Sequence, residues 1–182
     1  MEEIKRIIFA SDSGTSRAAM AAGILRSLPE AADFSVEARG LLVQFPEPLN
    51  QKAEAVMISN GIVWENFSSR QLEESDFEDG TMVFTMSADQ RQKILETYDG
   101  ATEENTRVLS AYVGDELEIV DPYGGSLQVY GLCFEVLKNA IERLPKKLRE
   151  EMCIRDSRRC CQSRLFSGKK PYRSGSAVPR SV

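Results

Sequence analysis

Residues 4–20 read IKRIIFASDSGTSRAAM, and this stretch decides the fold. The apolar run at residues 4–10 predicts a buried strand, the small polar residues after it predict a tight loop, and Arg17 opens a helix that Pro29 ends. Ser11 and Arg17 lie six positions apart. A loop of that length can direct several backbone N–H groups at one point, while Arg17 supplies a bidentate guanidinium group. The pattern predicts a site for an anion such as phosphate. A simpler interpretation, an ordinary polar turn between a strand and a helix, fits the same residues.

Outside this stretch, apolar segments of strand and helix type alternate along the chain. The predicted strands are residues 34–39, 81–86 and 108–113, and the predicted helices are residues 17–28, 51–60, 88–97 and a long one from Ser126 onward. Such alternation is typical of a parallel, doubly wound sheet. The fold class we expect is therefore α/β, with a four-stranded parallel sheet and helices on both faces.

A second loop points to the same edge of the sheet. Residues 121–125 read DPYGG and lead directly into the last helix. In an open α/β sheet, ligands bind beyond the carboxyl ends of the strands, so this loop and the loop at residues 11–17 can meet there. Taken alone, such a segment is more often a turn before a helix than a catalytic element.

The last helix carries an apolar stripe that we expect to belong to the core. Its members recur at three- and four-residue steps: Leu127, Tyr130, Phe134, Leu137, Ile141 and Leu144. Cys133 is interpreted as a small buried group without chemistry, and Trp64 as a packing residue without a ligand role.

The composition changes near residue 150. Residues 1–150 carry 15 Lys and Arg against 26 Asp and Glu, whereas residues 151–182 carry 8 against 2. The first part is expected to be one domain, and the second a disordered basic tail without helical or strand periodicity. Residues 152–157 read MCIRDS, which looks like the translation of a transposon end used in sequencing libraries. The tail is thus interpreted as foreign to the gene, and a genomic reading frame that runs uninterrupted to Val182 would refute this.

Charge and cysteine content exclude several classes of protein. An acidic domain is a poor nonspecific ligand for nucleic acid, because phosphate backbones attract positive charge. We expect no signal peptide; no apolar run is long enough to span a bilayer, and residues 1–150 contain one cysteine. No membrane partner and no disulfide framework are expected, and a reducing cytoplasm is the predicted location.

Several segments together resemble the low-molecular-weight protein tyrosine phosphatase family. The family's loop reads roughly V-C-x-G-N-x-C-R-S-P; Arg17 and the following Met20 match the family, and Ser11 lies at the position of the nucleophilic cysteine. Residues 46–61 look like the family's P-x-D-P-x-A helix segment. Residues 69–72 (SRQL) are similar to its A-R-Q-L stretch, and residues 82–90 to its strand and M-D-x-x-N turn.

The resemblance implies a phosphatase-I-like fold and a set of roles. Arg17 would bind phosphate with the backbone of Asp12, Ser13, Gly14, Thr15 and Ser16. Asp121 would be the general acid of the family's Asp-Pro loop. Phe45 and Tyr123 would form walls of the substrate pocket. The expected substrate is a phosphotyrosine-containing protein or a small phosphate ester, and neither a cofactor nor a metal is implied.

The chain departs from the family at the reacting group. A cysteine phosphatase relies on a thiolate of lowered pKa, and the hydroxyl of Ser11 has a pKa far too high to ionise in the same loop. The chain contains no histidine to act as a base. A phosphoserine formed at Ser11 would tend to persist. Asp12 would repel a phosphate dianion unless its side chain turns outward.

Three hypotheses follow. The protein is a hydrolase of phosphotyrosine or small aryl phosphates, with Ser11 or another group as nucleophile. Alternatively, it is a pseudophosphatase that binds a phosphorylated or acidic partner through Arg17 without turnover. In the third hypothesis, Asp12 pairs with Arg17, closes the loop, and leaves an interaction domain that binds no phosphate.

Overall fold

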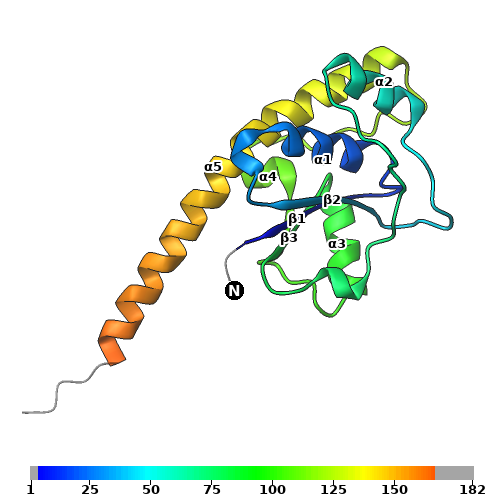
Figure 1. Cartoon of the computed structure of the whole chain (residues 1–182). Helices are drawn as coiled ribbons and strands as arrows, with labels where there is room; N and C mark the ends of the chain where they lie inside the picture. Colours follow the sequence, from blue (N-terminus) through cyan, green and yellow to red (C-terminus); the bar gives the residue numbers. More distant parts are fainter. Residues whose placement is uncertain (1–3, 167–182) are drawn as a thin grey trace, which may run out of the picture.

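A computed structural model describes residues 4–166, and the side chains of residues 4–154. Four strands, β1 (Arg6–Ser11), β2 (Ser35–Gly40), β3 (Thr81–Thr85) and β4 (Thr106–Val108), form one sheet in the order β2-β1-β3-β4. All three pairings are parallel. The predicted α/β fold with a four-stranded parallel sheet is confirmed (Figure 1).

Helices cover both faces of this sheet, as Figure 1 shows. One face carries α1 (Arg17–Ser27), α2 (Gln51–Ser59), α4 (Leu109–Val113) and α5 (Leu127–Phe166), and the other carries α3 (Ala88–Thr97). Two short 3-10 helices, η1 (Pro29–Ala31) and η2 (Glu74–Asp76), lie in the connections. Because every crossover runs through a helix, the carboxyl ends of the strands share one edge of the sheet.

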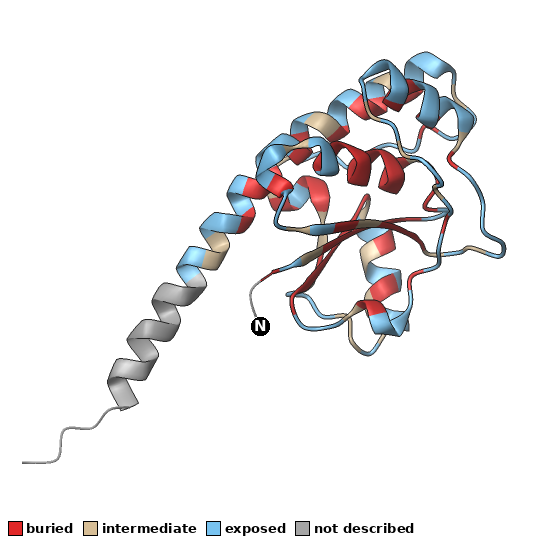
Figure 2. Cartoon of the chain, viewed as in Figure 1, coloured by how far each residue is buried: buried red, intermediate tan, exposed pale blue. Residues whose placement is uncertain are grey.

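The core lies in two layers, since successive side chains of a strand point to opposite faces. Phe9 of β1 and Phe84 of β3 are fully buried with Met20 of α1 on the larger side. Ile8 and Val83 are buried against Ile94 of α3 on the other side. Figure 2 shows that α1 is buried along most of its length. The helix that follows the 11–17 loop is therefore fixed between the sheet and α5.

The fourth strand was predicted in the wrong place. Residues 108–113 were expected to be extended, but β4 ends at Val108 and α4 begins at Leu109. Leu109 and Tyr112 are both buried, three positions apart, which is helical spacing rather than the alternation of a strand. Gly114 then ends α4 with a φ of +90°, in the left-handed region that glycine adopts readily.

The last helix differs from the prediction at both ends. Leu127 was assigned to the core but is 52% exposed, because it lies in the first turn, before the helix reaches the sheet; the rest of the predicted stripe is buried. Residues 151–166 were expected to lack regular structure, yet they continue α5. Neither glycine nor proline occurs between Lys146 and Phe166, so nothing in that stretch stops a helix once it has begun. Residues 167–182 of the predicted tail lie outside the described residues. None of the helices in the described part of the chain combines the length and apolar character needed to cross a membrane.

Candidate functional site

The 11–17 loop connects the end of β1 to the start of α1. The carbonyl oxygen of Ser11 accepts a hydrogen bond from the amide of Leu41, and that of Asp12 accepts one from Leu42. The carbonyl of Thr15 accepts from the amide of Asn50. The loop is thus tied through its carbonyl groups to the segment after β2 and to the start of α2.

The amide groups of this loop are left available. Among the hydrogen bonds of residues 4–166, none is donated by the amides of Asp12, Ser13, Gly14 or Ser16. Ser16 is the N-cap of α1 and its side chain makes no capping bond, so the first-turn amides of the helix also lack an acceptor. Free amides and the positive end of a helix dipole together favour an anion at this position.

Gly14 allows the loop to lie close to β2. Its φ is +76°, and a Cβ atom built there would be 2.7 Å from the amide nitrogen of Gly40. A side chain at this position would therefore clash with the backbone of β2 and strain its own backbone. The loop and the carboxyl end of β2 are consequently packed backbone against backbone.

Arg17 is the central cation of the site, and it is 6% exposed. Its Nη1 donates to the carbonyl of Ile119 at 3.1 Å. Its Nη2 donates to Oδ2 of Asp121 at 2.7 Å and to Oδ2 of Asp12 at 3.1 Å. The loop at residues 121–125 therefore does meet the 11–17 loop, and the guanidinium group lies between two carboxylates.

Asp12 turns toward Arg17. Besides its bond to Arg17, its Oδ2 accepts a hydrogen bond from Nε2 of Gln90 at 2.7 Å. Gln90 is 3% exposed, and its Oε1 accepts from the amide of Met86. The carboxylate of Asp12 thus occupies a position beside Arg17 that an anionic ligand would also seek. Sequence reasoning did not identify Gln90 as a site residue, although it stands at the Asn position of the family's M-D-x-x-N turn.

Ser11 is at the end of β1 with 3% exposure, so its hydroxyl is shielded from bulk water. Ser13 and Thr15 share a hydrogen bond between their hydroxyl groups at 2.9 Å. Their mutual bond stiffens the loop between Ser11 and Arg17. The assigned roles of these residues stay predictions.

The two predicted pocket residues are highly exposed. Tyr123 is 85% exposed, and its amide donates to Oδ1 of Asp121 at 3.1 Å, which fixes the orientation of that carboxylate. Phe45 is 75% exposed and follows the segment that holds the loop through Leu41 and Leu42. Neither ring is packed into the core, so each is accessible to a ligand.

Cys133 is not an activated thiol. Burial raises the pKa of its thiol to about 11, while the opposing charges of Arg17 and Asp121 act on it in opposite directions. At neutral pH the group stays protonated, and only a thiolate attacks phosphorus. Within residues 4–154, no three His, Cys, Asp or Glu side chains gather closely enough to hold a metal ion.

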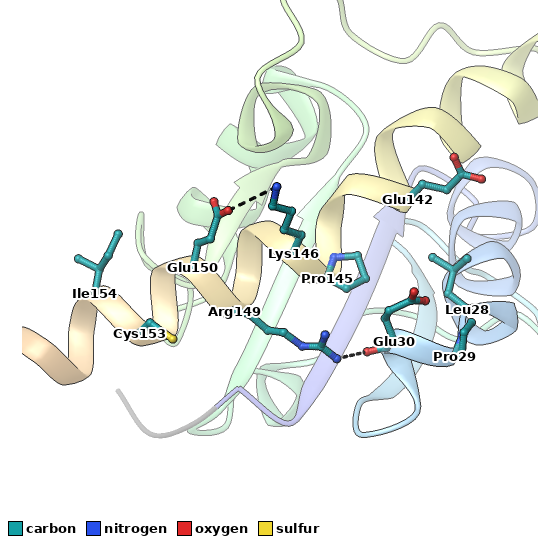
Figure 3. Close-up of a pocket in the computed structure, with 10 residues that line it drawn as sticks. All are labelled: Leu28, Pro29, Glu30, Glu142, Pro145, Lys146, Arg149, Glu150, Cys153 and Ile154. Carbon is teal, nitrogen blue, oxygen red and sulfur yellow. Dashed lines mark hydrogen bonds and ion pairs between the residues drawn. The ribbon is translucent and has the colours of Figure 1, made fainter.

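A hollow of about 930 Å³ lies elsewhere, between α5 and the turn after α1 (Figure 3). Pro29 and Glu30 form one side of it, and Pro145, Arg149 and Ile154 of α5 form the other. Arg149 donates to the carbonyl of Glu30 across it. No residue of the 11–17 loop lines this hollow, so it is not part of the candidate site.

Comparisons with known proteins agree with the geometry. The family model described as low molecular weight phosphotyrosine protein phosphatase matches residues 6–154. The chain is 27% identical over 146 residues to a protein-arginine-phosphatase of Geobacillus stearothermophilus, covering 80% of this chain and 97% of that protein. It is 28% identical over 141 residues to the low molecular weight protein-tyrosine-phosphatase PtpB of Staphylococcus haemolyticus, covering 76% and 96%.

One solved structure with a similar fold carries a serine in its active site. It is a cysteine-to-serine mutant of the YwlE arginine phosphatase, described as having a phosphorylated active site serine. The TM-score is 0.72 at 26% identity, and the match covers 79% of this chain and 95% of that one.

Proposed function

Because the chain belongs to the low molecular weight phosphotyrosine protein phosphatase family, we propose that its 11–17 loop binds the phosphoryl group of a phosphorylated protein side chain. Turnover is weak or lost, since Ser11 stands where the family has its nucleophilic cysteine. The observation that carries this proposal is the buried guanidinium group of Arg17, which lies beside free loop amides and is bonded to Asp121.

Phosphate can bind beside Arg17 only if the carboxylate of Asp12 moves away from it. A phosphate dianion that replaces Asp12 beside Arg17 would gain the unused loop amides and the helix dipole. The side chain of Asp12 is 56% exposed, so its carboxylate can turn outward into water at little cost in desolvation. The Asp12 contact therefore lowers the affinity for phosphate without closing the site permanently.

Ser11 then acts as a phosphoryl acceptor. Its Oγ bonds to phosphorus while the bond from phosphorus to the side-chain oxygen or nitrogen of the phosphoprotein breaks. Asp121 accepts the hydroxyl proton of Ser11 as a general base and then, as a general acid, gives it to the departing side-chain oxygen or nitrogen. The products are a dephosphorylated side chain and phosphoserine 11. The relative with a phosphorylated active site serine supports this step.

Release of the phosphoryl group is the slow step. The serine alkoxide is a far poorer leaving group than a thiolate, because the pKa of a hydroxyl is several units higher, and each unit is worth about 1.4 kcal/mol. The protein would retain the phosphoryl group after one transfer. The names of the relatives point to phosphotyrosine or phosphoarginine in proteins as the donor. A reducing cytoplasm is the proposed location.

A second function, that of an interaction domain that binds no phosphate, is favoured by the contacts of Asp12. Asp12 is bonded to both Arg17 and Gln90, which is the arrangement expected if the loop is closed internally and serves only in an interaction domain.

Hydrolysis of p-nitrophenyl phosphate by the natural chain and by its Ser11→Cys variant separates these functions. We expect turnover only in Ser11→Cys, abolished by the further change Arg17→Ala. Sustained turnover by the natural chain would contradict the role given to Ser11. If Ser11→Cys is folded but inactive, and stays inactive when Asp12→Ser is added, the interaction domain is the better account.

A further inference from the structure

A second cleft lies on the far side of β2 from β1. Its volume is about 200 Å³, and it is formed by the end of α1, the outer edge of β2 and the segment that leads from α2 toward η2. The lining residues include Arg26, Arg39, Trp64, Ser68 and Arg70. No residue of the 11–17 loop and no residue of the 121–125 loop contributes to it.

The cleft is rich in guanidinium groups although the domain is acidic. Nε and Nη2 of Arg39 are bonded to the carboxylate of Asp76, and Nη2 also pairs with Glu37. In the described part of the chain, neither Arg26 nor Arg70 pairs with a carboxylate. Two cations without a counter-ion therefore border one cleft.

Part of the cleft wall is held by contacts other than the side chains of these two cations. Trp64 packs edge-on against Phe67, with 5.0 Å between ring centroids. The backbone of Arg70 accepts a hydrogen bond from the amide of Gly40, and the amide of Leu72 donates to the carbonyl of Gly40. Because the backbone of Arg70 is already held in this way, little backbone entropy is lost when its side chain binds an anion.

One acidic side chain also lines the cleft, and its charge is neutralised. Glu37 accepts from Nε of Arg6 at 2.9 Å and pairs with Nη2 of Arg39. These two cations hold the pKa of Glu37 below its ordinary value although burial acts in the opposite direction. The carboxylate of Glu37 is thus engaged by Arg6 and Arg39, and it forms no ion pair with Arg26 or Arg70.

We infer that this cleft is an oxyanion-binding site, in which Arg26 and Arg70 hold a carboxylate or phosphate group. Charge-assisted hydrogen bonds from guanidinium groups are the usual means of binding such groups. Asn66 and Ser68 also line the cleft and supply neutral donors. The inference does not rest on phosphate binding at the 11–17 loop.

The fluorescence of Trp64 can report anion binding in this cleft. It is the single tryptophan of the 182 residues, and the guanidinium carbon of Arg26 lies 4.5 Å from its ring centroid. An anion that draws Arg26 from the ring changes the surroundings of the indole. The full chain is titrated at constant ionic strength with inorganic phosphate, and separately with an acetylated hexaglutamate peptide, while tryptophan fluorescence is recorded.

We expect a saturable change in the natural chain and in Arg17→Ala. In Arg70→Gln the dissociation constant should rise by about tenfold or more, because one charge-assisted contact is lost. The side chain of Arg70 makes no hydrogen bond or ion pair with the described residues, so this variant should keep its fold. Lys93→Gln, on α3 across the sheet, removes the same charge and should leave binding unchanged.

Two results would overturn the inference. One is binding in Arg70→Gln that equals binding in the natural chain. The other is a fluorescence change that disappears in Arg17→Ala, since the anion would then be acting from the 11–17 loop. If the peptide binds more tightly than phosphate, the site prefers carboxylates; the reverse order shows that it prefers phosphate.

Discussion

At the scale of single residues, we propose that Asp12 controls access to the site. Its carboxylate shares Nη2 of Arg17 with Asp121, so the guanidinium group faces two negative charges before any ligand arrives. A phosphate group must compete with Asp12 for that contact. In this respect Asp12 behaves as an internal anion, held in place by Gln90.

Replacing Asp12 by Asn should therefore strengthen phosphate binding. The variant removes a like charge from the site while keeping a side chain that Gln90 can still contact, and we expect the dissociation constant for inorganic phosphate to fall by about three- to tenfold. Calorimetric titration measures this change.

Asp89→Asn is the matched control, because it removes an exposed carboxylate from the first turn of α3 without touching Arg17. Equal strengthening in both variants would show that only net charge matters. Unchanged affinity in Asp12→Asn would show that the Asp12 contact does not compete with the ligand.

Sequence reasoning identified part of this site. The spacing of Ser11 and Arg17 was sufficient to predict a loop, and the topology rule brought Asp121 to the same edge. The direction in which the Asp12 side chain turns could not be read from the sequence, because it depends on Gln90, which lies 78 positions away along the chain.

At the scale of elements, β1 and β2 are joined by more than their hydrogen-bonded ladder. Arg6 of β1 bonds to Glu37 of β2 and to Asp76 of η2, and Arg39 of β2 bonds to the same two carboxylates. One member of this network also lies against the 11–17 loop, because a Cβ atom built on Gly14 would be 2.9 Å from the carbonyl carbon of Arg39. The carboxylate of Asp76 thus holds the residue of β2 on which Gly14 packs.

The network should make stability depend on pH. Because Arg6 and Arg39 lower the pKa of Glu37 in the folded protein, the unfolded chain binds more protons as the pH falls below the ordinary value of 4.5. The contribution of Glu37 is complete above that pH and is lost as the pH falls through the folded pKa.

Glu37→Gln should accordingly be less stable than the natural chain at pH 7 by about 1 kcal/mol, and the difference should shrink between pH 5 and pH 3. Urea unfolding of both proteins at pH 5 and at pH 3 measures this difference in the free energy of unfolding. A difference that stays constant with pH would mean that Glu37 does not contribute through its charge.

Helices were predictable from the sequence where apolar residues recur at helical spacing over several turns or where a capping residue precedes the helix. The predicted helix at residues 51–60 is found as α2, and it follows Asn50, a residue type that favours the N-cap, whose side chain accepts from the amides of Lys52 and Ala53. The error at residues 108–113 arose because a three-residue strand is too short for alternation to be recognised, and α4 follows it without a break.

At the scale of the whole molecule, the sheet and α5 hold the two loops of the site together. The guanidinium group of Arg17 bridges the start of α1 and the loop before α5, while the core residues of both helices lie in one cluster. The family match ends at residue 154, close to the change in composition near residue 150. We propose that the sequence beyond this point does not belong to the natural gene.

The most direct test of the account is the intact mass of the full chain after incubation with p-nitrophenyl phosphate or with a phosphoarginine-containing protein. We predict a stable gain of one phosphoryl group, located on Ser11 by peptide mapping and absent from Ser11→Ala and Arg17→Ala. The account would be contradicted if Ser11 stayed unmodified under conditions in which inorganic phosphate binds at Arg17.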